Sequence, residues 1–286
     1  MLALHSFAPY PQMRFGLKDG KHAISAVHTP RQNHLLAALP VSDCERLLPD
    51  LEPVALPPGR TIYGAGNRQR HLYFLTAGIV ARFYVMQSGA STEFAITGSE
   101  GVIGVASFLG GESTPSQAVV VCAGYAYRMR ADRLRHEFVH GGSLAHLLLR
   151  YTGALIAQTA QTVVCNRHHS VEQQLCRSLL LILDRSPSKE LTMTHELIAN
   201  MLGVRREAVT AAAGKLQAAG LIQYERGRIS VLDRPKLEAQ VCECYAVDKL
   251  EYDRLLRPES TVGNADPDSG CRTVPVGKSP TQSELT

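Results

Sequence analysis

Hydrophobic and polar residues alternate differently in successive parts of the chain. Between residues 54 and 129, short runs of β-branched and aromatic residues are separated by glycines at roughly ten-residue spacing. These runs are 71–75, 79–86, 91–97, 117–122 and 125–129. Short strands with glycine turns are typical of an antiparallel jelly-roll or barrel, and the segment 72–80 predicts two strands that meet at a tight turn at Gly78.

After Arg130 the spacing becomes helical. Intervals of 4-3-4-3-4-3 residues join Leu144, Leu148, Tyr151, Leu155, Gln158, Thr162 and Cys165. This spacing has two interpretations. One is a helix that packs on its own β domain, and the other is a coiled-coil seam between two chains, in which polar Gln158 and Thr162 set the register. A capping box at Ser170–Gln173 then predicts the start of the next helix.

Residues 191–232 predict two helices followed by a hairpin. Thr194 caps the first helix, Gly203 provides the turn, and the second helix runs from about Arg205 to Ala219. Strands over 221–225 and 228–232 then pair around Gly227. This order of elements is that of a winged helix-turn-helix.

The second helix of this motif begins with residues that suit DNA. Guanidinium groups pair with guanine edges and carboxylates with cytosine amino groups, so the predicted base-reading residues are Arg205, Arg206, Glu207 and Thr210. The predicted phosphate contacts are Thr194, Lys215, Arg226 and Arg228. A solvated first helical turn, or a winged helix that binds a protein, would have the same residues, so both alternatives stay open.

Composition and charge narrow the class of protein. The 286 residues include 30 Lys and Arg against 26 Asp and Glu, a net charge of +4. Residues 189–236 alone hold eight basic and five acidic residues. Seven scattered cysteines without a CxxC pair indicate a reduced, cytoplasmic protein. No uncharged apolar stretch is long enough to span a membrane, and no secretory signal precedes the first domain.

Several motifs together resemble the cyclic-AMP receptor and fumarate–nitrate regulator (Crp/Fnr) family of bacterial transcription regulators. The matching segments are Tyr73–Leu75 with Gly78, Gly101–Gly104, Thr194–Ala199, Leu202–Val204, Arg206–Glu207 and Val209, together with residues 166–175. The resemblance implies an α+β protein with an N-terminal antiparallel β-roll, a long dimerisation helix and a C-terminal winged helix-turn-helix. It also implies a homodimer that reads two-fold symmetric double-stranded DNA, with RNA polymerase as a candidate partner and the dimer seam on residues 144–165.

The expected domain boundaries follow from these patterns. They are a flexible arm over 1–34, a sensor roll over 35–142, a dimerisation helix over 143–168, a winged helix with a C-terminal helix over 169–256, and a disordered tail over 257–286. The C-terminal helix is expected to pack on the wing or on the partner chain.

The chain departs from the family at the positions that bind cyclic AMP. Family members that bind it have a glutamate after the Gly-x-x-Gly turn and an arginine that pairs with the cyclic phosphate, whereas this chain has Val105 and neutral Gln117. Cyclic AMP is therefore not expected in the usual mode. The predicted effector pocket consists of Gly104, Val105, Ser116, Gln117 and Thr159. Ala211 replaces an arginine common in the recognition helix, which predicts a different operator.

No cofactor or metal is predicted. Cys44 and Cys122 alone cannot supply the four thiolates of an iron–sulfur cluster. Cys242 and Cys244 resemble half a metal site, but no convergent ligand is evident near them in the sequence, so they are interpreted as ordinary thiols. No enzyme motif is present. The prediction is a DNA-binding transcription regulator; the alternative is a ligand-sensing or protein-docking module.

Overall fold

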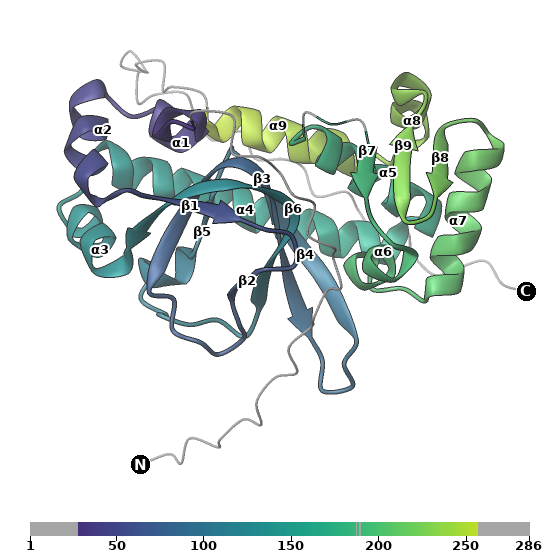
Figure 1. Cartoon of the computed structure of the whole chain (residues 1–286), viewed down its shortest axis with the longest axis horizontal. Coiled ribbons are helices and arrows are strands. Elements are labelled where there is room, and N and C mark those ends of the chain that lie inside the picture. Colours follow the sequence, from purple (N-terminus) through teal and green to yellow (C-terminus); the bar gives the residue numbers. More distant parts are fainter. Residues whose placement is uncertain (1–27, 187, 189, 257–286) are drawn as a thin grey trace, which may run out of the picture.

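A computed structural model describes residues 28–186, 188 and 190–256 of the chain. The β-roll and the winged helix lie side by side, and the long helix over Ser143–His168 runs behind the roll and ends at the winged helix (Figure 1). The predicted tail, and all but the last residues of the predicted arm, lie outside the described residues. No helix in the described ranges is long and apolar enough to cross a membrane.

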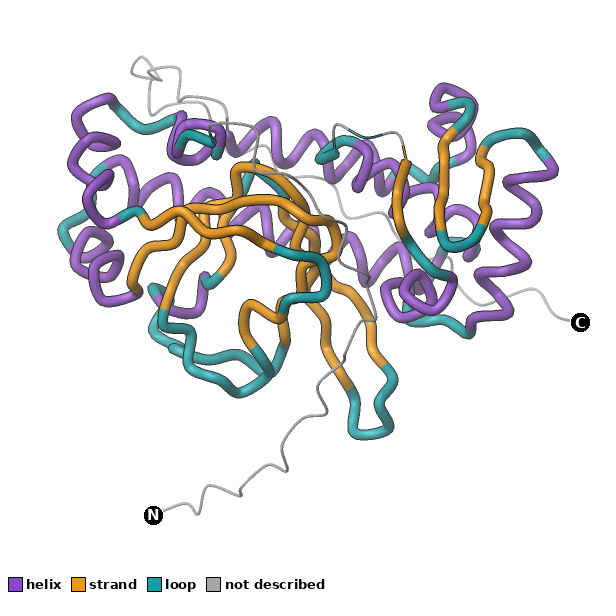
Figure 2. The backbone as a smooth tube through the Cα atoms, viewed as in Figure 1, coloured by secondary structure: helices purple, strands orange, loops and turns teal. Residues whose placement is uncertain are grey.

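The β-roll is a six-stranded antiparallel sheet with short helices at one end (Figure 2). Its strands are β1 (Glu52–Leu56), β2 (Thr61–Tyr63), β3 (His71–Val85), β4 (Ser91–Thr97), β5 (Val102–Ile103) and β6 (Gln117–Arg130). The central order is β1-β6-β3-β4, with β2 paired to β6 and β5 to β3. Before the sheet lie η1 (Pro30–Gln32), α1 (His34–Ala37), α2 (Val41–Leu47) and η2 (Leu48–Asp50), and within and after it lie η3 (Val105–Ser107) and α3 (Ala131–Val139).

The turn predicted at Gly78 is wrong, because β3 continues through this residue as one strand. β3 pairs with β6 along its length, and the register shifts between Leu75 and Val80. Gly78 has a φ of 83°, and a Cβ there would lie 2.7 Å from the Cys122 carbonyl oxygen. A Cβ at Gly124 on β6 would lie closer still, 2.0 Å from the Ala77 carbonyl oxygen. Two glycines therefore face each other at a bulge, where the absence of side chains lets the paired strands bend together.

The long helix α4 (Ser143–His168) has the bounds that the sequence pattern predicts, but the predicted dimer seam lies on its inner side. All seven residues of the 4-3-4-3-4-3 pattern are buried within their own subunit. Tyr151, for example, is fully buried, and its hydroxyl lies 2.9 Å from that of Thr97 in the roll. The assignment of these residues to a seam between chains is wrong. The alternative, a helix packed on its own β domain, describes Leu144, Leu148 and Tyr151. Thr162 and Cys165 instead pack against α5 (Val171–Leu183) and the residues at the start of α9 (Cys244–Leu256).

The winged helix follows α4 with little interruption. Its elements are α5 (Val171–Leu183), β7 (Glu190–Thr192), α6 (His195–Leu202), α7 (Arg206–Ala218), β8 (Ile222–Glu225), β9 (Arg228–Val231) and α8 (Arg234–Gln240). The Ser170–Gln173 capping box at the start of α5 is confirmed. Apolar residues of α5 and α6 share one core with the outer face of the roll, including Phe83 and Ile96. The half of the chain that carries the helix-turn-helix is thus docked on its own β-roll.

The last helix, α9 (Cys244–Leu256), leaves the winged helix and returns along α4 (Figure 1). The expectation that it packs on the wing is wrong. Tyr252 is buried in the apolar core between the roll and α4, which includes Leu72 and Leu148 and which we call the roll-side core. Asp248 forms a buried ion pair with Arg177 of α5, with an Nη2–Oδ2 distance of 2.6 Å. Arg177 also donates to the Thr162 hydroxyl on α4. These contacts join three helices at the point where the roll and the winged helix meet.

Candidate nucleic-acid interface

The helix-turn-helix is held by local signals that the sequence contains. The Thr194 side chain caps α6 by accepting a hydrogen bond of 3.1 Å from the Leu197 amide. Gly203 ends the helix in the left-handed region, with a φ of 67°. A Cβ at Gly203 would lie 2.4 Å from Thr92 Oγ1 of β4, so the turn sits directly against the roll. Thr194 therefore has a structural role in addition to its predicted phosphate contact.

The predicted base-reading residues lie together at the start of α7. Arg205 is the N-cap residue, and Arg206 and Glu207 follow in the first turn. All three are exposed. Among the described residues, no carboxylate pairs with either guanidinium. Two exposed arginines that pair with no carboxylate in the described part of the chain suit the binding of an external acceptor.

Thr210 lies one turn further on and takes part in a small polar cluster. Its hydroxyl is 3.0 Å from His195 Nδ1 and also donates to the Arg206 carbonyl. The His195 ring stacks on Tyr224 of the wing at a centroid distance of 4.1 Å. Burial, with a smaller effect from the charge of Arg206, lowers the pKa of His195 below its usual range. A neutral His195 links α6, α7 and the wing.

Sequence reasoning missed this role of His195, although the residue lies in the matched motif. The signal that could have found it is the aromatic residue at 224, three positions before the wing glycine. Only the closure of the wing onto α6 places the two rings in contact.

The predicted phosphate contacts differ in their ion pairing. Lys215 is ion-paired with Glu172 on α5, and its side chain is 70% exposed. Arg228 pairs with Glu190 across the small sheet at 3.3 Å, and both side chains are largely exposed. Arg226 is at the tip of the wing with 91% of its side chain exposed. Exposed ion pairs contribute little energy, so Lys215, Arg226 and Arg228 all remain accessible to a phosphate.

The tip of the wing is a two-residue turn with left-handed backbone at both positions. Arg226 has a φ of 49° and Gly227 a φ of 80°. This combination is the type I′ geometry that joins tightly twisted hairpin strands. Glycine adopts it freely, whereas arginine does so at a cost.

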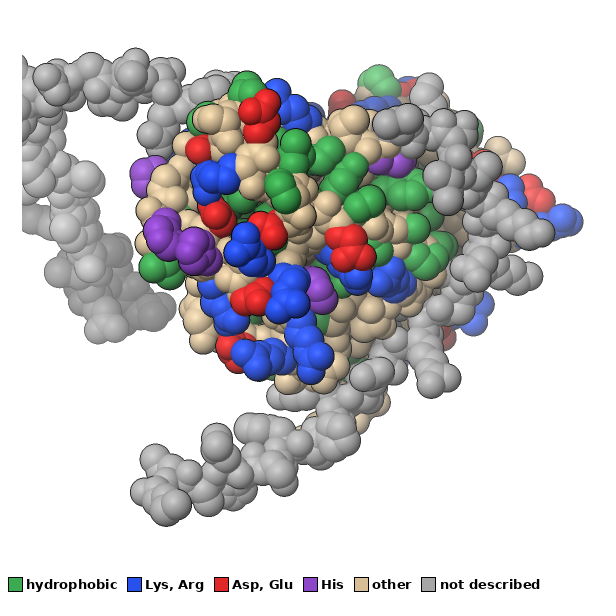
Figure 3. Space-filling view, turned by 60° about the vertical axis from the view of Figure 1, so that its left-hand side comes forward, with side chains coloured by type: hydrophobic (Ala, Val, Ile, Leu, Met, Phe, Trp, Pro, Cys, Tyr) green, Lys and Arg blue, Asp and Glu red, His purple; other side chains and the backbone are tan. Residues whose placement is uncertain are grey.

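The β-roll does not present a comparable basic surface on the face at its α2 and α3 end. Figure 3 shows basic and acidic side chains intermixed there. Arg46 pairs with Glu137, and Arg133 pairs with Asp50 at 3.0 Å. Because these charges compensate one another, this face is not suited to bind a polyanion.

The predicted effector residues are mostly used by the fold. Gly104 has a φ of 111°, and a Cβ there would lie 2.7 Å from the His71 carbonyl oxygen. Val105 packs against the roll-side core. Ser116 and Gln117 are buried. The Thr159 hydroxyl donates to the Leu155 carbonyl of its own helix, at 2.8 Å.

The roll interior also contains a charged residue that the sequence did not single out. Arg82 of β3 is 2% exposed and donates to the Val102 carbonyl and to the Tyr151 hydroxyl, at 3.0 and 3.1 Å. It thereby connects the sheet to α4. Its position in the middle of an apolar strand gave no sign that the side chain would be buried with hydrogen-bond partners at its Nη2 atom.

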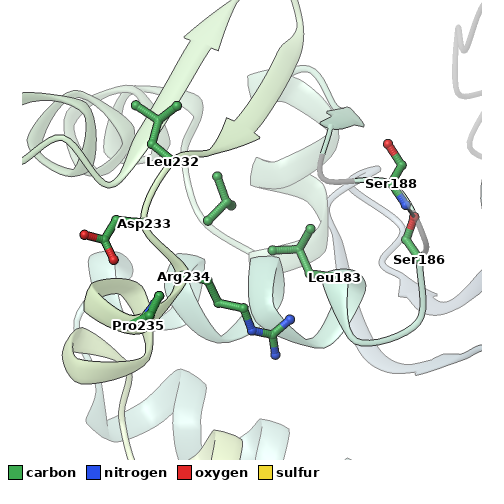
Figure 4. Close-up of a pocket in the computed structure, with 8 residues that line it drawn as sticks. Leu183, Ser186, Ser188, Leu232, Asp233, Arg234 and Pro235 are labelled. Atoms are coloured by element: carbon green, nitrogen blue, oxygen red, sulfur yellow. Dashed lines mark hydrogen bonds between the residues drawn. The ribbon is translucent and has the colours of Figure 1, made fainter.

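A cavity of about 430 Å³ lies in the winged helix, between the end of α5 and the start of α8, and Figure 4 shows the residues that line it. It is lined by Leu183, Ser186, Ser188, Val231, Leu232, Asp233, Arg234 and Pro235. Arg234 pairs with Asp184 and with Glu238. None of the predicted effector residues lines this cavity, and it therefore does not correspond to the predicted pocket.

The interpretation of Cys242 and Cys244 rested on the absence of convergent ligands, and that premise is wrong. The structure places Cys165 and His169 beside them, with the ligand atoms of all four within 4.8 Å of one another. The sequence separates these pairs by more than seventy residues, so only the return of α9 along α4 brings them together.

Comparisons with known proteins agree with this architecture. A model of the cyclic nucleotide-binding domain matches residues 53–139, and a model of the Crp-like helix-turn-helix domain matches residues 173–240. The Global nitrogen regulator of Synechococcus elongatus is 28% identical over 192 residues, covering 64% of this chain and 86% of that protein. A CRP-like cAMP-activated global transcriptional regulator of Mycobacterium tuberculosis is 25% identical over 198 residues, covering 67% and 88%.

Solved structures share the fold. A putative transcriptional regulator of the Crp/Fnr family from Eubacterium rectale superposes with a TM-score of 0.60 at 17% identity, over 72% of this chain and 96% of that one. FixK2 from Bradyrhizobium japonicum gives 0.56 at 17% identity, over 67% and 98%. A β-roll followed by a Crp-like helix-turn-helix defines a class of DNA-binding transcription regulators. Within that class, this chain belongs to the Crp/Fnr family.

Proposed function

We propose that the protein is a cytoplasmic homodimer that binds a two-fold symmetric DNA site and regulates transcription from it. The observation that carries this proposal is the start of α7, where Arg205, Arg206 and Glu207 are exposed and the two arginines have no carboxylate partner among the described residues. These residue types match the donor and acceptor pattern of G·C pairs in the major groove. The exposed Arg226 at the wing tip supplies a phosphate contact beside it.

A second copy of the chain is the proposed occupant of the outer side of α4. Leu149, Ile156 and Val163 are spaced at seven residues and are 51%, 65% and 65% exposed. We call these three residues the outer stripe. Gly153 and Ala160 lie between them, and a Cβ at Gly153 would meet no atom within 4 Å. A heptad of apolar residues separated by small ones suits close packing of two parallel helices.

The sensor roll is proposed not to bind cyclic AMP in the usual mode. Val105 packs into the core and cannot bond a ribose hydroxyl. Gln117 is buried and neutral, so it cannot neutralise a cyclic phosphate. The name of the Mycobacterium tuberculosis relative records activation by cAMP, and this chain is expected to differ from it.

Selection of bound fragments from random DNA tests the proposal. The expected result is a palindrome with half-sites about 34 Å apart, the spacing of one helical turn. Binding should weaken steeply with salt because phosphate contacts release counterions. Arg206→Ala should lose about 1–3 kcal/mol of discrimination at one base pair of each half-site. Arg70→Ala, which removes an exposed arginine from the roll, is the control and should leave that discrimination unchanged.

The competing function is a winged helix that binds a protein. No enriched palindrome, together with DNA binding that Arg206→Ala does not alter, would overturn the regulator and favour that module. The effector is addressed separately by thermal unfolding with cyclic AMP, for which no shift in Tm is expected. A ligand present at 100 times its Kd would stabilise the protein by about 2.7 kcal/mol.

A further inference from the structure

Four side chains that commonly bind metals meet at the junction between the roll and the winged helix. Cys165 lies in the last turns of α4, and His169 is the residue that ends this helix. Cys242 and Cys244 come from the turn between α8 and α9 and from the start of α9. The three cysteines are buried, and the His169 side chain is 13% exposed.

We propose that these residues form a structural zinc site with a Cys₃His ligand set. Zinc bound tetrahedrally, with Zn–S bonds of about 2.3 Å and Zn–N bonds of about 2.0–2.1 Å, places two sulfurs about 3.8 Å apart and a sulfur and a nitrogen about 3.5 Å apart. The Cys165 and Cys242 sulfurs are 3.7 Å apart, and Cys244 Sγ is 3.5 Å from His169 Nδ1. Both distances correspond to edges of such a tetrahedron.

The chemistry of the ligands favours zinc over other cations. Sulfur and imidazole ligands bind zinc strongly, whereas magnesium and calcium prefer oxygen. Four protein ligands fill the tetrahedron and leave no open position for a substrate, which is the arrangement of structural sites. A Cys165–Cys242 disulfide would need the two sulfurs to approach to about 2.05 Å, and it would not account for the proximity of Cys244 and His169.

Neighbouring polar groups orient the ligands. His169 Nε2 lies 3.4 Å from Glu243 Oε2, an arrangement that directs the opposite ring nitrogen, Nδ1, toward the sulfurs. The Gln161 side-chain amide donates a hydrogen bond of 2.9 Å to Cys244 Sγ. Three thiolates exceed the charge of one zinc ion by one negative unit, and an amide donor partly compensates that excess.

The position of the site indicates what the metal does. The chain enters the winged helix at Ser170, directly after His169, and leaves it after α8, directly before Cys242. Bound zinc ties the entry and the exit of this domain to the end of α4. It therefore fixes the angle between the long helix and the helix-turn-helix. The effect on DNA binding rests on the proposed function, because only a DNA-binding dimer needs two recognition helices at a set spacing.

Metal content of the full chain, purified under reducing conditions, tests the site directly. The expected result is about one zinc per chain by mass spectrometry of the metal. After chelation, added cobalt(II) should produce thiolate charge-transfer absorption and the visible bands of a tetrahedral centre. Cys244→Ser should abolish the full set of bands, and Cys122→Ser, which removes a thiol from the roll, should leave them unchanged.

A milder variant keeps the test valid if Cys244→Ser fails to fold. The Glu243 side chain is 75% exposed, so Glu243→Gln should fold normally while binding zinc about 10–100-fold more weakly. Wild-type protein that contains no zinc and gives no cobalt–thiolate absorption would overturn the proposal. A Cys165–Cys242 disulfide in protein isolated without exposure to air would overturn it as well.

The zinc site and the proposed function fail in different ways. Protein that contains zinc but selects no DNA would refute the regulator and leave the metal site standing. Protein that selects a palindrome but binds no zinc would refute only the metal site. If both hold, chelation should weaken DNA binding and zinc should restore it, whereas Cys122→Ser should respond as the wild type does.

Discussion

The outer stripe of α4 allows the proposed dimer to be tested at one residue, Ile156. This side chain is 65% exposed in the single chain. Full burial of an isoleucine contributes ~1.5–3 kcal/mol, so covering the exposed part contributes ~1–2 kcal/mol, and ~2–4 kcal/mol for the two copies related by the dyad. Ile156→Arg removes this contribution and brings two like charges together. The dimer Kd should rise at least ~30-fold.

The measurement is sedimentation equilibrium over a range of protein concentrations. Leu148→Ala is the matched control, because Leu148 is on the same helix but fully buried inside the subunit. In the Ile156→Arg background, where association does not contribute, Leu148→Ala should lower the free energy of unfolding by about 2–5 kcal/mol. In the otherwise native chain, Leu148→Ala should leave the dimer contact at the outer stripe intact.

Two results would refute the reasoning. One is Ile156→Arg protein that dimerises with the Kd of the wild type. The other is Leu148→Ala protein that dissociates into monomers while keeping its free energy of unfolding. That result would place the dimer contact on the face of α4 that carries the heptad pattern of residues 144–165.

Three other changes probe the roll, the interface between the two domains, and the wing. Gly124→Ala should prevent the roll from folding normally, because the new Cβ would lie 2.0 Å from the Ala77 carbonyl oxygen. Urea unfolding is the assay. Gly89→Ala is the control: its Cβ would meet no atom within 4 Å, so the free energy of unfolding should fall only by the strain of the positive φ. Burial raises the pKa of Glu93 to about 8, from about 4.5 in the unfolded chain. Between these two pH values the folded protein keeps a proton on Glu93 that the unfolded chain does not, so folding is coupled to proton uptake. The free energy of unfolding should therefore fall as pH rises from about 5 to 8, and Glu93→Gln should flatten this dependence. If the free energy of unfolding varies with pH identically in the two proteins, Glu93 is ionised in the folded state. Arg226→Gly should raise Tm slightly by relieving the left-handed backbone, while it weakens DNA binding equally at all sequences and reduces the salt slope by about 1. Unchanged affinity and salt slope would remove Arg226 from the phosphate contacts.

The docking of the winged helix on the roll depends on charges as well as on the shared core. Arg185, in the turn just after α5, and Glu100 of the roll form an ion pair of 2.6 Å that is about nine-tenths buried on both sides. Glu93 lies in the same region, and its Oε2 atom has no hydrogen-bond partner among the described residues. Such groups make an interface sensitive to displacement, because a buried charge that loses its partner is strongly destabilising. Separation of the roll from the winged helix would therefore require other interactions that compensate for the loss of the Arg185–Glu100 ion pair.

Elements with local causes were predictable from the sequence. The capping box at Ser170, the Thr194 cap, the left-handed Gly203 and the Arg226–Gly227 turn each depend on residues within a few positions of one another. The winged helix could therefore be recognised, and the exposed start of α7 could be located, without knowledge of the rest of the molecule. The length of α4 followed in the same way from its periodicity.

The sequence by itself thus determined the long helix and the helices and hairpin of the winged helix, and which short motif carries the proposed base-reading side chains. Tertiary structure alone decided which side of α4 is covered by its own subunit, because a heptad pattern records that a face is apolar but not what packs on it. It also decided that β3 bends through Gly78 without a turn, since the opposing Gly124 is far away in the chain. The meeting of Cys165 and His169 with Cys242 and Cys244 likewise required α9 to return along α4, and no local preference encodes a contact between segments so distant.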